Sequence, residues 1–171
     1  MASSDGGRPG VDGTLFRTVM RRWASGVTVA TVRDGDDVRG ITLSSFSSVS
    51  LDPPLVLISV DKRAVCHGMI GRSGHFCVHI LAEGQTLISD RFAGRRPGEH
   101  AEFADCSTGT TPSGAPIIDR CLGYFDCRVT AAVDGGDHTI FVGLVEAGEA
   151  TDDVAPLVFY AGSYRKIETT A

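Results

Sequence analysis

The sequence predicts a mainly β fold, a closed or split antiparallel barrel with two or three short helices. Six or seven segments have the apolar and β-branched composition of strands, and the short helical segments do not alternate with them. This order excludes a doubly wound parallel sheet. In addition, Asp134-Gly-Gly-Asp137 separates two of these segments and is a strong signal for a β-hairpin. The strands are therefore expected to pair with antiparallel neighbours.

The first expected element is a helix. Phe16, Val19, Met20 and Trp23 recur at helical spacing with arginines between them, which predicts an amphipathic helix that ends near Gly26. Two more short helices are expected at residues 64–70 and 85–91. Residues 95–115 are rich in glycine, proline, serine and threonine, and this composition predicts a long loop.

The expected strands follow one another with few residues between them. Asp34-Gly-Asp-Asp37 predicts a turn between the first two strands. Pro53-Pro54 ends an extended run before the third, because a proline nitrogen cannot donate to a ladder. The third strand is apolar at nearly every position, which predicts burial on both faces. The strands are expected at residues 27–32, 38–44, 55–60, 76–81, 122–132, 139–150 and 157–160.

Length and composition limit the class of protein. The 171 residues, 42% of them hydrophobic, are enough for a single domain, expected at residues 14–168 after a disordered leader at residues 1–13. No apolar run reaches the ~20 residues that a membrane helix needs, and the N-terminus lacks an apolar signal segment, so we expect a cytoplasmic protein. The net charge of −5 argues against a nucleic-acid surface and requires a local basic patch for any anionic ligand.

Metal chemistry is not expected from this sequence. The five cysteines include no Cys-x-x-Cys pair, which argues against a zinc site and against a disulfide framework. His75, Cys77 and His79 share one face of an expected strand, but the sequence points to no fourth ligand beside them. The sequence also lacks Gly-x-Gly-x-x-Gly, so a nicotinamide cofactor would have to bind without a Rossmann domain.

A row of small hydroxyl side chains is the most unusual feature of the chain. Strands ordinarily favour β-branched and aromatic residues, whereas small hydroxyls leave room above the backbone and offer hydrogen bonds. Such a surface suits a flat ligand with polar edges. The hydroxyls belong to Thr42, Ser44, Ser45, Ser47, Ser48 and Ser50.

Residues 40–62, which contain this row, resemble the signature of the short flavin reductases with an FMN-binding split β-barrel of Greek-key type. Further matching motifs occur in the same order along nearly the whole chain apart from its two ends. They lie at residues 16–32, 76–81, 91–94, 136–138 and 156–164.

The resemblance implies two groups of site residues. The flavin-binding group has hydroxyls and backbone amides for the ring system and ribityl chain, and charged residues before a helix for the phosphate. The flavin is expected to contact Thr42, Ser44, Ser45, Ser47, Ser48, Ser59, Asp61, Lys62, Arg63, Arg91, Phe92 and Tyr164. NAD(P)H is expected to contact His138, Phe92 and Tyr160.

The implied activity is that of an NAD(P)H:flavin oxidoreductase. Hydride passes directly from nicotinamide to flavin, so no residue is expected to act as a catalytic acid or base. Reduced flavin would then leave and supply a separate monooxygenase. The resemblance also implies a homodimer, with the helix that carries Trp23 and the strand that ends at Tyr160 at its interface.

Two other functions remain open at this stage. One is an oxidase of the same fold with tightly held FMN, and the other is a non-enzymatic flavin or haem carrier. The sequence favours FAD over FMN through the resemblance alone. It does not decide between NADH and NADPH, and it does not name the monooxygenase.

Overall fold

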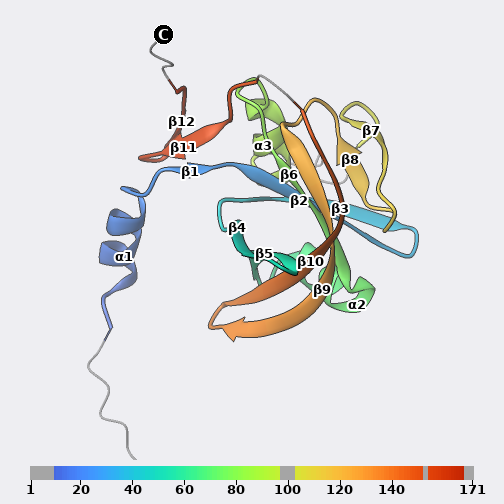
Figure 1. Ribbon diagram of the computed structural model, residues 1–171. Coiled ribbons are helices and arrows are strands. Elements are labelled where there is room, and N and C mark those ends of the chain that lie inside the picture. The colour runs from blue at the N-terminus through green and yellow to red at the C-terminus, as the bar shows by residue number, and fades with distance from the viewer. Residues whose placement is uncertain (1–9, 97–102, 152–153, 168–171) are drawn as a thin grey trace, which may run out of the picture.

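The structure is a computed structural model that describes residues 10–96, 103–151 and 154–167 (Figure 1). These residues form three helices and twelve strands. The helices are α1 (Gly13–Met20), α2 (Val65–Ser73) and α3 (Thr86–Phe92). The strands are β1 (Ser25–Gly26), β2 (Thr28–Asp34), β3 (Asp37–Leu43), β4 (Ser47–Leu51), β5 (Pro54–Asp61), β6 (His75–Ile80), β7 (Ser107–Thr110), β8 (Pro116–Ile118), β9 (Gly123–Gly135), β10 (His138–Ala150), β11 (Val158–Tyr160) and β12 (Ser163–Arg165).

Seven strands form one antiparallel sheet in the order β3-β2-β6-β9-β10-β5-β4. The sheet is strongly curved, with α2 and α3 at opposite ends of it (Figure 1). Register shifts between β9 and β10 mark bulges, which bend and twist strands locally. β3 and β4 are the two edges, and no ladder joins them in the described part of the chain. The mainly β, antiparallel fold is confirmed, with the barrel split between β3 and β4.

Residues 44–46 connect the two edges of the split. β3 ends at Leu43 and β4 begins at Ser47, so this short segment crosses from one edge of the sheet to the other. The Ser45 hydroxyl fastens the crossing to β5, because it donates to the Ser59 carbonyl at 2.8 Å and accepts from the Ser59 amide at 3.1 Å. The hydroxyl-rich row therefore begins on β3, crosses the split and continues along β4.

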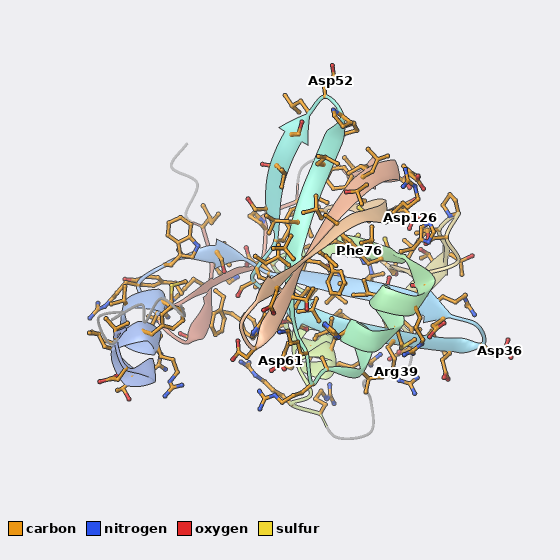
Figure 2. All side chains as sticks on the ribbon, turned by 90° about the horizontal axis from the view of Figure 1, so that it is seen from below. Asp36, Arg39, Asp52, Asp61, Phe76 and Asp126 are labelled. Carbon is orange, nitrogen blue, oxygen red and sulfur yellow. The ribbon has the colours of Figure 1, made fainter. Side chains whose placement is uncertain are left out.

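The larger core lies inside the curved sheet and under α2. β5 contributes Val56, Ile58 and Val60, which are buried, while the residues between them are only half buried. The expectation that this strand is buried on both faces is therefore wrong. The physical reason is that β5 pairs on one side with the short edge strand β4, and their hairpin projects from the body at Asp52 (Figure 2). A smaller core, which includes Leu81, lies under α3.

Most expected strands are confirmed within a few residues, and the differences have local causes. The first helix ends at Met20 instead of near Gly26, because residues 25–26 pair with β11 as β1. Residues 95–115, expected to be a loop, contain β7, which pairs with β8. A further short strand, β12, follows the last expected one. Of the predicted leader, residues 1–9 lie outside the described residues, and Asp12 belongs to the fold as the cap of α1.

α1 stands apart from the curved sheet and is joined to it through β1 (Figure 1). Its apolar stripe is present as expected, but no residue of the helix is buried. Phe16 is 58% exposed and Trp23, just beyond the helix, is 70% exposed. An amphipathic helix normally buries such a stripe, so α1 presents an apolar surface that its own chain leaves open.

The buried His79 predicts that the fold loses stability in mild acid. Burial lowers the pKa of the His79 imidazole from 6.5 to about 4, against smaller opposing effects of the Val29 carbonyl and Asp126. Between these values the unfolded chain binds a proton that the folded protein does not bind. The free energy of unfolding therefore falls as the pH drops through this range.

Substitution of His79→Gln removes this titration and leaves the other groups in place. Urea unfolding at about pH 7 and about pH 5 should show a smaller loss of stability in the variant than in the wild type. Equal losses would show that His79 does not contribute to the acid sensitivity.

Candidate functional site

Three neighbouring cavities form one groove along β3 and the split. The first has a volume of about 380 Å³ and lies between β3, the start of α2 and the end of α3. The second, of about 170 Å³, shares Thr42 and Ala93 with the first. The third, of about 780 Å³, shares Ser44 and Phe159 with the second and extends to α1. The groove thus follows the chain from β3 to the crossing segment.

The fold explains why the groove follows β3. Because β3 is an edge strand, the backbone groups on its outer side have no neighbouring strand. Gly40 has no side chain, and a Cβ at this position would lie 2.5 Å from the ring of Phe92. Phe92 can therefore pack closely against the strand. This packing joins α3 to β3 and forms one wall of the groove.

The hydroxyls of the row differ in their hydrogen-bond partners within the protein. Thr42 donates to the Ser89 carbonyl at 2.7 Å, and Ser45 is bonded to Ser59, so both hold the groove in shape. Ser47 is exposed and donates to the Ser48 carbonyl at 3.1 Å. Ser44 is exposed in the second and third cavities, and within residues 10–96, 103–151 and 154–167 its hydroxyl makes no hydrogen bond. The groove thus includes fastened hydroxyls together with accessible ones.

The charged residues at the end of β5 and directly after it do not line this groove. Lys62 forms an ion pair with Asp134 and donates to the Gly136 carbonyl at 2.5 Å. Arg63 binds the Asp61 carboxylate through two nitrogens, at 2.7 and 3.1 Å. This pairing holds the pKa of the Asp61 carboxyl well below its usual range. Both cations thus have carboxylate partners, and neither lines the three cavities. A phosphate contact at these residues stays a prediction.

Arg91 and Phe92 also have partners within the protein. Arg91 is 8% exposed and binds both oxygens of Asp105, at 2.6 and 2.8 Å, which lowers the pKa of that carboxyl to about 2. Phe92 stacks on Phe103, with ring centroids 5.1 Å apart. Phe92 lines the first cavity, but one face of its ring is already covered. Arg91 therefore anchors the segment at Asp105, and its contact with a phosphate stays a prediction.

The remaining expected residues lie on the last two strands and at the β9–β10 turn. Tyr164 lines the second cavity and packs edge-on against Phe159. Its hydroxyl donates to Asp90 at 2.7 Å, which fastens β12 to α3. Tyr160 is half buried at the end of β11. His138 lies at the β9–β10 turn, 2.7 Å from the Asp137 carboxylate, and does not line the three cavities.

Several groove residues were missed at the level of sequence. Arg39 and Arg95 line the first and second cavities, and Arg17 and Arg21 line the third. Arg17 on α1 and Arg21 at its C-terminal cap are four residues apart, so they lie on one face of the helix. This spacing could have indicated a basic face, but only the apolar stripe of the same segment was considered. Arg39 directly precedes the matching motif and gave no signal of its own.

The described residues contain no group of three histidine, cysteine or acidic side chains placed to hold a metal ion. Cys77 and His79 are buried, and Cys77 Sγ lies 3.4 Å from His79 Nε2. His79 Nδ1 is hydrogen-bonded to the Val29 carbonyl at 3.1 Å. Among the described helices, none has the length and apolar character required to span a bilayer.

Comparison with known proteins identifies relatives over nearly the whole chain. The flavin reductase like domain matches residues 20–168. The flavin-dependent monooxygenase reductase subunit HsaB of Rhodococcus jostii is 38% identical over 158 residues, covering 92% of this chain and 80% of that protein.

Two solved structures have the same fold. The flavin reductase PheA2 in its native state has a TM-score of 0.84 and 34% identity, covering 93% of this chain and all of that one. The NADH:FAD oxidoreductase SgcE6 of Streptomyces globisporus, in complex with NAD and FAD fragments, has a TM-score of 0.86 and 35% identity, covering 94% of this chain and 95% of that one.

Proposed function

The chain belongs to the flavin reductase like domain family, and from this premise we infer that it is an NADH-dependent oxidoreductase that reduces FAD or FMN. The single observation that carries this function is the groove, the three cavities with shared lining residues, which four hydroxyls of the row line: Thr42, Ser44, Ser45 and Ser47. The relatives are reductases, and several are named for NADH. This favours the reductase over an oxidase with tightly held FMN and over a flavin or haem carrier.

The donors along the groove fit a flavin. Ser44 offers an accessible hydroxyl, and the small side chains of Ser44 and Ser45 leave room for a planar ring above the backbone. Phe46 and Phe159 supply apolar surface in the third cavity. When both are bound, NADH supplies a hydride and the flavin accepts it. We infer that Ser44 and Phe159 orient the ring, and Ser45 keeps the crossing segment fixed beneath it.

The protein contributes orientation instead of proton transfer. Direct hydride transfer requires the reacting atoms to be held about 3–3.5 Å apart, and it needs no acid or base. Among the expected NAD(P)H residues, Tyr160 lies on the strand that also carries Phe159, whereas His138 is bonded to Asp137 at the distant turn. The contact between His138 and NADH stays a prediction.

We propose that reduced flavin is passed to a separate monooxygenase. The relatives named as reductase subunits or components of monooxygenases support this. The groove supports it as well, since its largest cavity borders the exposed helix α1 and is not enclosed by the barrel. We also propose a homodimer, in which the exposed apolar stripe of α1 is covered by a second copy of the chain. A cytoplasmic location stays a prediction.

The test is oxidation of NADH by the purified protein, followed by absorbance, with and without added FAD or FMN. We expect a rate that depends on added flavin and saturates with it, because the flavin is a substrate. Oxidation without added flavin, together with flavin retained through purification, would instead indicate a tightly bound group. Light scattering on the same sample should give twice the mass of one chain.

A further inference from the structure

Each cation expected to bind the flavin phosphate already has a carboxylate partner in the structure. The net charge of the chain is −5, so a phosphate has to find a local positive site. Lys62, Arg63 and Arg91 are bound to Asp134, Asp61 and Asp105, respectively. A cation already paired with a carboxylate would have to give up that partner in order to bind a phosphate.

Arg39 is the arginine of the first cavity, at the end of the groove beyond Thr42. It lies on β3 and is half buried, and its Nη1 donates to the Val38 carbonyl at 2.8 Å. In the described part of the chain, Arg39 forms no ion pair. Four of its five guanidinium N–H groups are therefore available to a ligand.

The surroundings of Arg39 are otherwise suited to an anion. The cavity is lined by Gly40, Gly94 and residues 64–66, and no acidic side chain lines it. Burial raises the pKa of the Cys66 thiol to about 11, and the Arg39 guanidinium opposes the rise, which places this charge close to the first turn of α2. Figure 2 shows Arg39 beside α2, at the other end of the molecule from Asp52.

We propose that Arg39 binds the phosphate group that adjoins the ribityl chain of the flavin. This rests on the proposed function, and it places the ring over the crossing segment and the phosphate in the first cavity. FMN and FAD both carry a phosphate at this position. The proposal therefore distinguishes phosphorylated flavins from riboflavin, which carries none.

The experiment compares the Michaelis constants for FMN, FAD and riboflavin in the wild type, Arg39→Ala and Arg39→Lys. A charge-assisted hydrogen bond to a phosphate is lost in Arg39→Ala, so its Michaelis constants for FMN and FAD should rise at least about tenfold. The constant for riboflavin should stay unchanged. Arg39→Lys should recover part of the loss, because lysine keeps the charge but not the planar fork.

Arg72→Ala is the matched control. Arg72 is an arginine at the other end of α2, paired with Asp34 at 2.7 Å, and its removal should change no flavin constant. A loss in Arg39→Ala that is equal for FMN and riboflavin would overturn the proposal, since it would be a general structural effect. Unchanged constants in Arg39→Ala, or a loss in Lys62→Ala instead, would also overturn it. If the wild type reduces no flavin with NADH, the proposed function itself fails.

Discussion

Phe76→Ala is expected to lower the free energy of unfolding by about 3–5 kcal/mol. Phe76 lies on β6, is fully buried and occupies the middle of the larger core (Figure 2). The Phe76 ring packs against Gly143 on β10, where a Cβ would lie 2.7 Å from the ring. The ring therefore occupies the space that a side chain at position 143 would otherwise need. Truncation leaves a cavity that the surrounding strands cannot close without changing their pairing.

Urea unfolding measures this effect, with Phe125→Ala as the control. Phe125 is on β9 and is 37% exposed, so its removal should cost much less than the removal of Phe76. Similar losses in the two variants would mean that the core around Phe76 can relax, contrary to the packing in the structure. Because the core supports β5 as well as β2, we also expect Phe76→Ala to weaken the crossing segment that Ser45 fastens to β5.

Asp126→Ala is expected to cost about 2–4 kcal/mol of unfolding free energy. Asp126 lies on β9 and is 3% exposed. Its carboxylate accepts from the Ser113 amide at 2.9 Å and from the Ser113 hydroxyl at 2.6 Å. Removing the carboxylate leaves the Ser113 amide without its acceptor, and the Ser113 hydroxyl keeps only Thr111 Oγ1, at 3.0 Å. The segment between β7 and β8 then loses one of its attachments to the sheet and keeps the hydrogen bond from Arg33 Nε on β2 to the Gly114 carbonyl at 2.7 Å.

The control for Asp126 is Asp36→Ala, at the exposed turn between β2 and β3 (Figure 2). This substitution should change stability by no more than about 0.5 kcal/mol. The variant Ser113→Ala and the double variant complete a thermodynamic cycle. If the interaction between Asp126 and Ser113 carries the effect, the double variant should lose less than the two single variants together. Additive losses would show that the two residues stabilise the fold independently.

The strands were predictable because their signals are local. The apolar run along β5, the turn at Asp34–Asp37 and the Gly135-Gly136 pair at the β9–β10 turn each lie within a few residues. The hydroxyl row is also a local pattern, and four of its six members, Thr42, Ser44, Ser45 and Ser47, line the groove. The confirmed fold therefore rests on patterns that neighbouring residues make together.

The ion pairs of the expected cations were not predictable because they join residues that are far apart in the sequence. Lys62 meets Asp134 across the sheet, and Arg91 meets Asp105. These partners occupy two of the expected cations, whereas Arg39, which lines the groove, belongs to no motif. The pairing of β1 with β11 was not predicted for the same reason, because the two strands are far apart in the sequence. The pairing of β7 with β8 was also not predicted.

The open edge of β4 has a consequence for the behaviour of the protein at high concentration. Exposed edge strands invite other chains to pair with them, and this is a common start of aggregation. β4 is a short edge strand, carries Ser47, Ser48 and Ser50, and has an irregular register near Val49, all of which discourage such pairing. Small hydroxyls that suit a flavin therefore also keep the edge from joining another sheet. Replacing them with β-branched residues would favour pairing of this edge with another sheet, and at Ser47 it would also reduce the third cavity.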